Sequence, residues 1–273
     1  MTRLNLLRAS AASVLALAAA CSHAQAIHDG GLFTTILPAN DDSSTGLVNL
    51  GFSALINSTS YTQTYVNNNG NITFDNPLPT FTPSAISSGS FGPIIAPFFA
   101  DVDTRGSDSN PVTYGTGMIG GHNVFGVNSI HVGVYAEQRI FNSFQMILTD
   151  RSDVGSGDFD IQFNYDSIVW EAGTASGAPA GGLGGTSALV GYWTSAASNS
   201  TLAGSLVNGA LIDGGPDALI SHTLNSNVLG QYNFQVRAGE VISNVPEPET
   251  YALMALGLAV VGFAARKRGQ KQA

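Results

Sequence analysis

The amino-acid sequence predicts an all-β protein, with an antiparallel β-sandwich-like domain between an N-terminal signal helix and a C-terminal transmembrane helix. Apolar and polar residues alternate through residues 158–165 and 231–237, which is the period of strands with one buried face. Clusters of Gly, Ser, Asn, Asp and Pro separate such runs, as expected for turns. Few long helical periods occur outside the two ends of the chain. Together these observations favour two packed antiparallel sheets.

The composition alone argues against several classes of partner and of structural site. Of the 273 residues 44% are hydrophobic, which is enough for a packed core. Residues 27–245 contain no lysine, and their four arginines stand against 17 acidic residues, a net charge of −13. This charge argues against nucleic acid as a partner, because phosphate binding requires clustered Lys and Arg. The single Cys of the chain excludes a disulfide framework and a Cys-based zinc site.

Residues 1–26 have the features of a secretory signal peptide. A positive start precedes a short apolar run, and Ala24 and Ala26 form the small-x-small site for signal peptidase, so the mature chain would begin near Ile27. The apolar run is too short for a membrane anchor, which needs about 20 residues. Lipidation of Cys21 is the alternative. We therefore expect export.

Residues 27–45 form a lead-in, and residues 46–240 are expected to form the β domain. The Asn-Asn-Gly sequence at 68–70 favours the positive φ of a hairpin turn. Residues 94–99 are an unbroken apolar run, typical of a strand covered on both faces, whereas residues 172–185 have the composition of a loop. The expected strands are residues 62–67, 71–74, 94–99, 130–135, 142–148, 158–165, 187–193 and 231–237.

The C-terminal segment has three parts. Residues 241–250 are a linker with a Pro-Glu-Pro motif. Residues 251–265 are apolar and would span about 22 Å as a helix, which is short for a hydrocarbon core of about 30 Å. Residues 266–273 are a basic tail that would stay cytoplasmic and stop transfer. The residues expected to act in processing are Pro246, Glu247, Pro248, Arg266, Lys267 and Arg268.

This arrangement resembles the PEP-CTERM sorting signal of Gram-negative bacteria, in which a Pro-Glu-Pro motif precedes a short transmembrane helix and an Arg-rich end. The resemblance covers residues 245–268. It implies that an exosortase, a membrane protease, removes the tail after a transient inner-membrane stage. The protein would then reach the cell surface or extracellular matrix of a Gram-negative bacterium. An ordinary single-pass anchor is the alternative.

A second resemblance covers residues 46–240. Residues 65–74 (Tyr-Val-Asn-Asn-Asn-Gly-Asn-Ile-Thr-Phe) resemble the opening signature of the nidogen-like (NIDO) extracellular domain, and residues 93–103 resemble the second signature. In animals this domain occurs in basement-membrane and mucin-type adhesive proteins, so the resemblance implies a structural or adhesive role without catalysis. This chain lacks their neighbouring cysteine-rich modules, so no partner carries over. Segments similar to later parts of the family follow in order at 142–148, 158–165, 170–173, 188–192 and 230–234.

Two acidic residues in one short segment are the candidates for a metal site. If residues 101–103 are part of a strand, Asp101 and Asp103 share one face, and calcium prefers such carboxylate oxygens. The alternative is that the acids of the domain cap turns or pair with Arg105 and Arg151. The sequence leaves Ca²⁺ binding at Asp101 and Asp103 open and predicts no other cofactor.

Two further patterns have structural alternatives. Residues 115–120 fit Gly-x-Gly-x-x-Gly, but a dinucleotide site needs a following helix, so a glycine-rich turn is favoured. Trp170 and Trp193, with Tyr165 and Tyr192, would form a sugar-stacking platform if exposed and part of the core if buried. No catalytic motif is present, and the scattered histidines favour no triad.

The sequence therefore predicts a secreted, non-catalytic protein of the cell surface or extracellular matrix, with a structural or cell–matrix adhesive role in a polysaccharide-rich biofilm. The expected partners are signal peptidase, an exosortase-type protease, and extracellular polysaccharide or other matrix components. A carbohydrate- or calcium-dependent binding module is the alternative. A secreted hydrolase would need a triad or an acid pair in a cleft.

Overall fold

The structure is a computed structural model that describes residues 26–86, 91–136 and 138–242. No helix within these ranges is both long and apolar enough to cross a membrane. The predicted signal sequence up to Gln25 and the predicted transmembrane segment at 251–265 lie outside the described residues. The same is true of the processing residues Ala24, Pro246, Glu247, Pro248, Arg266, Lys267 and Arg268.

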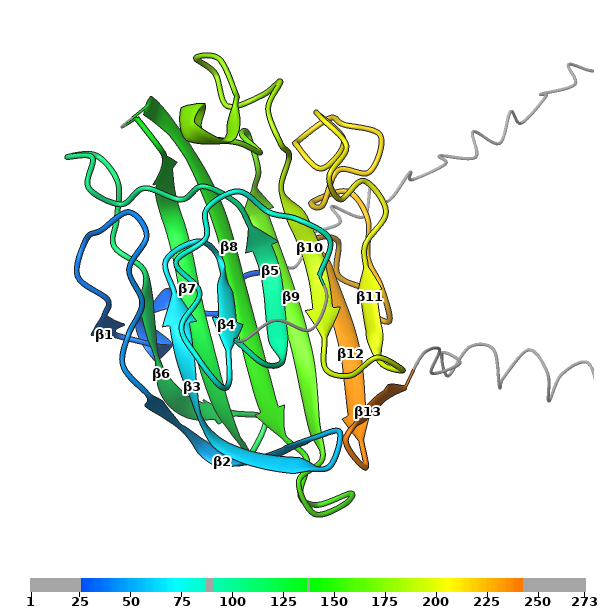
Figure 1. The fold of residues 1–273 in the computed structure, drawn as a ribbon. Coiled ribbons are helices and arrows are strands. Elements are labelled where there is room, and N and C mark those ends of the chain that lie inside the picture. Colours follow the sequence, from blue (N-terminus) through cyan, green and yellow to red (C-terminus); the bar gives the residue numbers. More distant parts are fainter. Residues whose placement is uncertain (1–25, 87–90, 137, 243–273) are drawn as a thin grey trace, which may run out of the picture.

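The described chain folds into two antiparallel sheets that face each other, which confirms the predicted sandwich-like all-β class (Figure 1). One sheet has the order β1-β6-β7-β8-β9-β12-β13, and the other has the order β11-β10-β5-β4-β3-β2. Two short 3-10 helices, η1 (Gly30–Leu32) and η2 (Thr174–Ser176), lie outside the sheets. The strands are β1 (Thr35–Ile36), β2 (Val48–Ile56), β3 (Thr59–Asn67), β4 (Asn71–Thr73), β5 (Ile94–Phe99), β6 (Thr113–Ile119), β7 (His122–Val134), β8 (Gln138–Asp150), β9 (Phe159–Ser167), β10 (Leu189–Trp193), β11 (Asn199–Thr201), β12 (Gln231–Arg237) and β13 (Glu240–Ile242).

The core lies between the sheets and is filled by the alternating residues that the sequence singled out. β9 and β12 are paired neighbours, and Phe163 of β9 lies diagonally across from Phe234 of β12 with ring centroids 5.4 Å apart. Trp170 is fully buried and packs edge-on against Phe98 of β5 at 5.6 Å. β5 is buried along its whole length, because a second cluster, which includes Leu78, covers its outer face. Alternation therefore predicted the inward faces correctly.

The Asn-Asn-Gly turn between β3 and β4 is present as predicted. Gly70 has φ 71, and a Cβ atom there would lie 1.9 Å from the carbonyl oxygen of Phe98. The glycine therefore meets two demands, the left-handed conformation and a close approach to the neighbouring strand. Asn67, Asn68 and Asn69 are buried and use their side chains within the fold.

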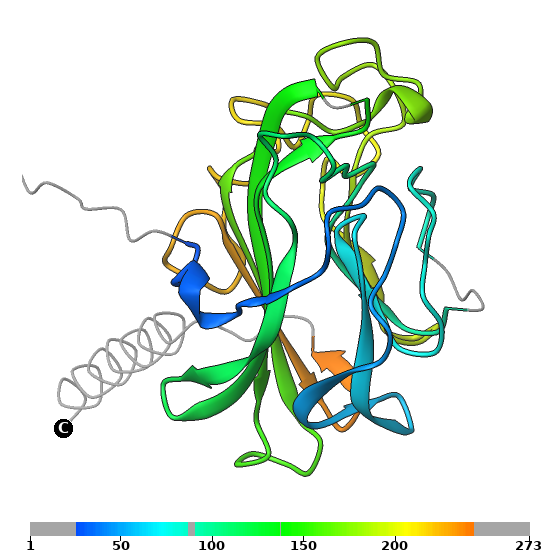
Figure 2. The same ribbon diagram turned by 90° about the vertical axis from the view of Figure 1, so that its left-hand side faces the viewer.

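The N-terminal lead-in starts on the outer side of the seven-stranded sheet and passes along its β1–β6 edge (Figure 2). Phe33 is completely buried there and packs in a cluster with Val124 and Ile147. Gly126 of β7 leaves space for it, because a Cβ atom would come within 2.0 Å of the Phe33 ring. Gln145 accepts a hydrogen bond from the backbone N–H of His28 and donates one to its carbonyl. The lead-in is thus part of the packed domain.

Candidate functional site

The chain leaves the sheet directly after β5, and this separates the two predicted metal ligands. β5 ends at Phe99, and Val102 forms only an isolated bridge with Val134. Asp101 and Asp103 therefore do not lie on one strand face, and that part of the prediction is wrong. Both residues are buried, but they contact different partners.

The carboxylate of Asp103 is neutralised by Arg105. The guanidinium donates from Nε to Oδ1 at 2.9 Å and from Nη2 to Oδ2 at 2.7 Å, and the backbone N–H of Arg105 also donates to Oδ1 at 2.9 Å. Such a bidentate pair occupies both oxygens in its plane. The pairing alternative is therefore confirmed for Asp103, because Arg105 binds both of its carboxylate oxygens.

Asp101 lies instead with Asp41 and Asp42. One carboxylate oxygen from each of the three residues lies within 4.8 Å of the others. Asp42 accepts a hydrogen bond from Asn69 Nδ2 at 2.9 Å, and Asp101 accepts one from Ser176 Oγ at 3.4 Å. Oδ1 of Asp41 is buried and has no hydrogen-bond partner. We call Asp41, Asp42 and Asp101 the acidic cluster.

The carboxylates of the acidic cluster repel one another. Burial raises the pKa of Asp101 to about 7, and the negative charges of Asp41 and Asp42 contribute to this shift. Burial, followed by repulsion from Asp103 and Asp42, raises the pKa of Asp41 to about 6, although Arg105 at 3.1 Å acts in the opposite direction. A proton or a cation would relieve this repulsion.

Asparagines of the β3–β4 turn hold the loop that carries Asp41 and Asp42. Asn68 Nδ2 donates to the carbonyls of Asn40, Asp41 and Val102. Asp41 and Asp42 were not predicted from the sequence, because they precede the domain signatures and lie far from Asp101 along the chain. The only local signal was the polar Asn-Asp-Asp-Ser-Ser run at 40–44, which is also the composition of an ordinary loop.

The acidic residues near Arg151 and Arg237 form ion pairs within the fold. Arg151 binds Asp153 and Asp160, and Arg237 binds Asp160 at 2.6 Å, with Asp158 at 3.9 Å. Arg139 is paired with Asp108. Every arginine between residues 27 and 245 thus has an acidic partner. The remaining surface charge of this region is therefore almost entirely negative.

The proposed aromatic platform is not formed. Trp170 and Tyr165 are fully buried, Tyr192 is buried to 7% exposure, and Trp193 packs half-buried against the cluster outside β5. Residues 115–120 also have a structural role, because β6 is followed by a tight turn and by β7, not by a helix. The predicted glycine-rich turn is wrong for most of this segment, because residues 115–119 belong to β6 and only Gly120 lies in the turn, and β7 follows in place of the helix that a dinucleotide site requires.

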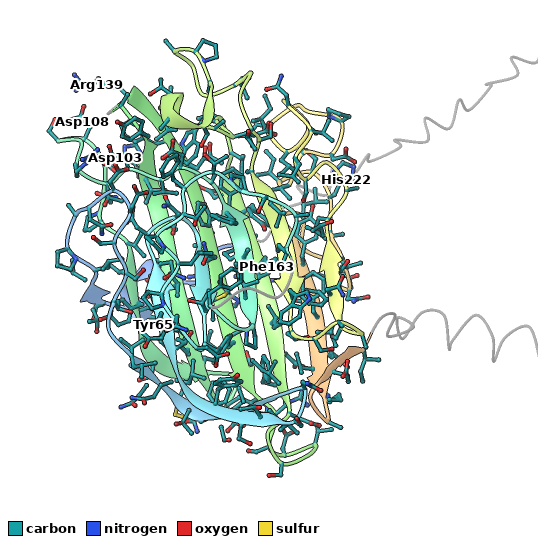
Figure 3. All side chains as sticks on the ribbon, viewed as in Figure 1. Tyr65, Asp103, Asp108, Arg139, Phe163 and His222 are labelled. Atoms are coloured by element: carbon teal, nitrogen blue, oxygen red, sulfur yellow. The ribbon has the colours of Figure 1, made fainter. Side chains whose placement is uncertain are left out.

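A small polar pocket lies beside Asp103 at one end of the sandwich, where Figure 3 shows Asp103, Asp108 and Arg139 together. Its volume is about 150 Å³. Loop 106–109 forms one wall, and the ends of β7 and β8 form the other. The lining residues are Asp103, Gly106, Ser107, Asp108, Ser109, Gly133, Arg139 and Phe141. Sequence analysis did not identify this site, because no motif connects the three segments.

Of the two predicted signal-cleavage residues, Ala26 is described. It is buried at 5% exposure, and its Cβ atom packs beside Gly230, where an added Cβ would lie 3.4 Å away. Ala26 therefore packs against the folded domain.

The comparisons with known proteins agree with both resemblances. The NIDO-related family matches residues 23–211, and the PEP-CTERM protein-sorting motif matches residues 244–268. The chain is 30% identical over 233 residues to alpha-tectorin of Gallus gallus and 31% identical over 232 residues to alpha-tectorin of Mus musculus. Each match covers 76% of this chain but only 10% of the alpha-tectorin. No solved structure matches the chain. Because the family match covers most of its length, the chain belongs to the NIDO-related family and carries a PEP-CTERM sorting motif.

Proposed function

We propose that this protein is exported, sorted by an exosortase and retained in the extracellular matrix, where it has a structural or adhesive, non-catalytic role. The observation that carries the proposal is the order of its parts: a NIDO-related sandwich is followed directly by a PEP-CTERM motif. The last strand, β13, ends at Ile242, and the motif begins at residue 244. The matched motif therefore begins two residues after the last described strand.

The described side chains support a role without catalysis. His131 stacks on Phe141 at 3.9 Å, the Nδ1 of His222 lies 3.0 Å from the carbonyl of Ala218, and His122 lies 3.9 Å from Asp153. These contacts are local and structural. The buried Glu171 accepts hydrogen bonds from the backbone N–H groups of Gly209 and Leu211, so it too serves the fold.

Surface charge favours one kind of matrix partner. With all four domain arginines paired, an anionic polysaccharide would meet mostly carboxylates and be repelled at low salt. A neutral polysaccharide meets no such barrier. We therefore propose a neutral matrix polymer as the partner.

The sorting step is tested by replacing its motif. Pro246→Ala combined with Glu247→Ala should keep the tail attached and hold the protein in the inner membrane, because the protease no longer recognises its substrate. Cell fractionation and intact mass measure the outcome, and wild type should lose both ends and leave the membrane. Glu249→Ala, just outside the Pro-Glu-Pro motif, is the matched control and should behave as wild type. If wild type also remains in the membrane with Arg266–Ala273 attached, the tail is an ordinary anchor and the proposal fails.

A second candidate function, calcium-dependent binding, is favoured by the orphaned oxygen of Asp41 within the acidic cluster. Three carboxylates and nearby carbonyls are the oxygen ligands that Ca²⁺ takes at about 2.3–2.6 Å. Of the two ligands predicted from the sequence, Asp101 would bind the ion. Asp41 and Asp42 would take the place of Asp103.

Thermal unfolding of the full chain with added CaCl₂ tests this candidate. Calcium should raise the Tm of wild type and leave that of Asp42→Asn unchanged, because the variant lacks one anionic ligand. Asp153→Asn, an exposed acid outside the cluster, is the control and should respond as wild type does. An equal response of wild type and Asp42→Asn, or none from wild type, rules the site out.

A further inference from the structure

The polar pocket beside Asp103 is small and is built by three separate segments. At about 150 Å³ it lies below the range of about 300–1,000 Å³ that is typical of sites for drug-sized ligands, so it has room for a single ring. Gly133 forms part of the pocket wall, where a Cβ atom would come within 2.9 Å of the Asp103 carbonyl. Its backbone N–H bonds Ser109 Oγ at 2.9 Å, which fixes the loop against β7. The pocket is therefore a defined part of the fold.

The charges that line the pocket are balanced, in contrast to the rest of the surface. Asp103 is compensated by Arg105 and Asp108 by Arg139. An anionic ligand would meet two carboxylates, and a cationic ligand would meet the guanidinium of Arg139. An uncharged ligand displaces neither ion pair, so the electrostatics favour a neutral molecule.

The exposed ion pair of Arg139 and Asp108 at the pocket can both donate a hydrogen bond to a hydroxyl group and accept one from it. The side chains of Arg139 and Asp108 are 79% and 40% exposed. A guanidinium has five N–H donors and a carboxylate about four acceptor sites, so their mutual contact leaves both with free capacity. A hydroxyl both donates and accepts, and two adjacent hydroxyls on a ring would match this donor–acceptor pair. Ser107 and Ser109 add hydroxyl groups to the same wall.

An aromatic ring completes the pocket. Phe141 is half-buried, and His131 stacks on it with a centroid distance of 3.9 Å and an interplanar angle of 23°. His131 has φ 59, a conformation that costs a non-glycine residue about 1–3 kcal/mol and often occurs at functional sites. The backbone N–H of His131 donates to Ser143 Oγ, and its carbonyl accepts from Asn110, so the strained residue is held in place. The stack fixes the orientation of the Phe141 ring.

We propose that this pocket is a subsite for one ring of a neutral saccharide, bound through the Arg139–Asp108 pair and packed on Phe141. The proposal rests on the proposed matrix function and names the chemistry by which the domain would hold its polymer. Sugar binding is thus assigned to this pocket and not to Trp170 and Trp193, and no sequence motif indicated the pocket.

Native affinity electrophoresis of the purified full chain tests the subsite. The probes are gels that contain dextran, hydroxyethyl cellulose or galactomannan, with alginate as the anionic comparison. We expect at least one neutral polymer to slow wild type and alginate not to do so. Phe141→Ala and Arg139→Ala should each weaken the apparent affinity by at least about fivefold, as expected for central contacts.

Two further variants separate binding from folding. Phe141→Tyr keeps the ring and should keep binding, and Met118→Ala, which removes a 63% exposed side chain from β6, should bind as wild type does. Each variant is compared at equal folded fraction by circular dichroism. The subsite is overturned if no neutral polymer slows wild type, if Phe141→Ala binds normally, or if alginate is the stronger ligand.

The same measurements distinguish the two proposals. Wild type that reaches the matrix but is not slowed by any neutral polymer contradicts the subsite alone. Wild type that binds a polymer in the gel but never leaves the inner membrane contradicts the matrix function alone.

Discussion

Asp101 makes the stability of this fold depend on pH. The residue is 1% exposed, and the pKa of its carboxyl group is raised to about 7 by burial and by its acidic neighbours. In the unfolded chain the same group titrates near its ordinary value of 3.8. Between these values the folded state binds more protons than the unfolded state. The free energy of unfolding therefore falls as pH rises through this window, and the contribution of Asp101 is lost by about pH 7.

Asp101→Asn should remove this dependence, because an amide keeps the shape and carries no charge. The variant should match wild type near pH 4 and exceed it by about 2–4 kcal/mol at pH 8 in chelator. Urea unfolding at both pH values gives the difference. Asp153→Asn is the opposite control, because Arg151 lowers the pKa of that exposed carboxyl. A constant difference between Asp101→Asn and wild type across pH would refute the coupling.

The β3–β4 hairpin is a short element in which several tightly packed contacts of the fold lie together. Its turn buries three asparagines and brings the backbone of Gly70 against β5. Two of these asparagines, Asn68 and Asn69, also bind Asp41 and Asp42, so the hairpin helps to position the acidic cluster.

Gly70→Ala should destabilise the domain by about 3 kcal/mol or more, because it combines a left-handed conformation with a backbone clash. Gly120→Ala is the matched control: φ is 59, but nothing lies within 4 Å of an added Cβ, so only the conformational cost of about 1 kcal/mol remains. Thermal unfolding compares the two. Equal losses would mean that the contact between Gly70 and Phe98 is not strained in the alanine variant.

Strands with one buried face were predictable, and other elements were not. β9 and β12 alternate cleanly because one face meets the core and the other meets solvent or polar side chains. β6 and β2 were missed, since Gly115, Gly117 and Gly51 interrupt the pattern and many of their residues are half-exposed. The acidic cluster and the pocket were missed for a different reason. Each combines residues from separate segments of the chain. The alternation of apolar and polar residues indicates only which face of its own strand a residue occupies.

At the scale of the whole molecule, excess negative charge opposes a compact state. The net charge of −13 over residues 27–245 is spread over a surface whose arginines are already paired. The domain contains no Cys, so packing between the two sheets must outweigh this repulsion.

Salt should therefore stabilise the protein. Raising NaCl from about 0.01 M to about 0.5 M shortens the screening length from about 30 Å to a few ångströms. We expect a gain of about 1 kcal/mol, or about 2–4 °C in Tm for a domain of this size. Scanning calorimetry at constant pH measures it, with sucrose as a control for solvent effects other than screening. A fall in Tm would show that the ion pairs outweigh the overall repulsion.

The position of β13 also has a mechanical consequence. β13 is a three-residue edge strand, held by β12 and by one bond from the Val241 N–H to Ser198 Oγ at 2.9 Å. Tension transmitted from the membrane through residue 242 would load this strand at its free end. Its backbone hydrogen bonds to β12 would break first, together with the packing of Val241 against the core. With the chain held through residue 242, this short edge strand would therefore detach before the two sheets separate.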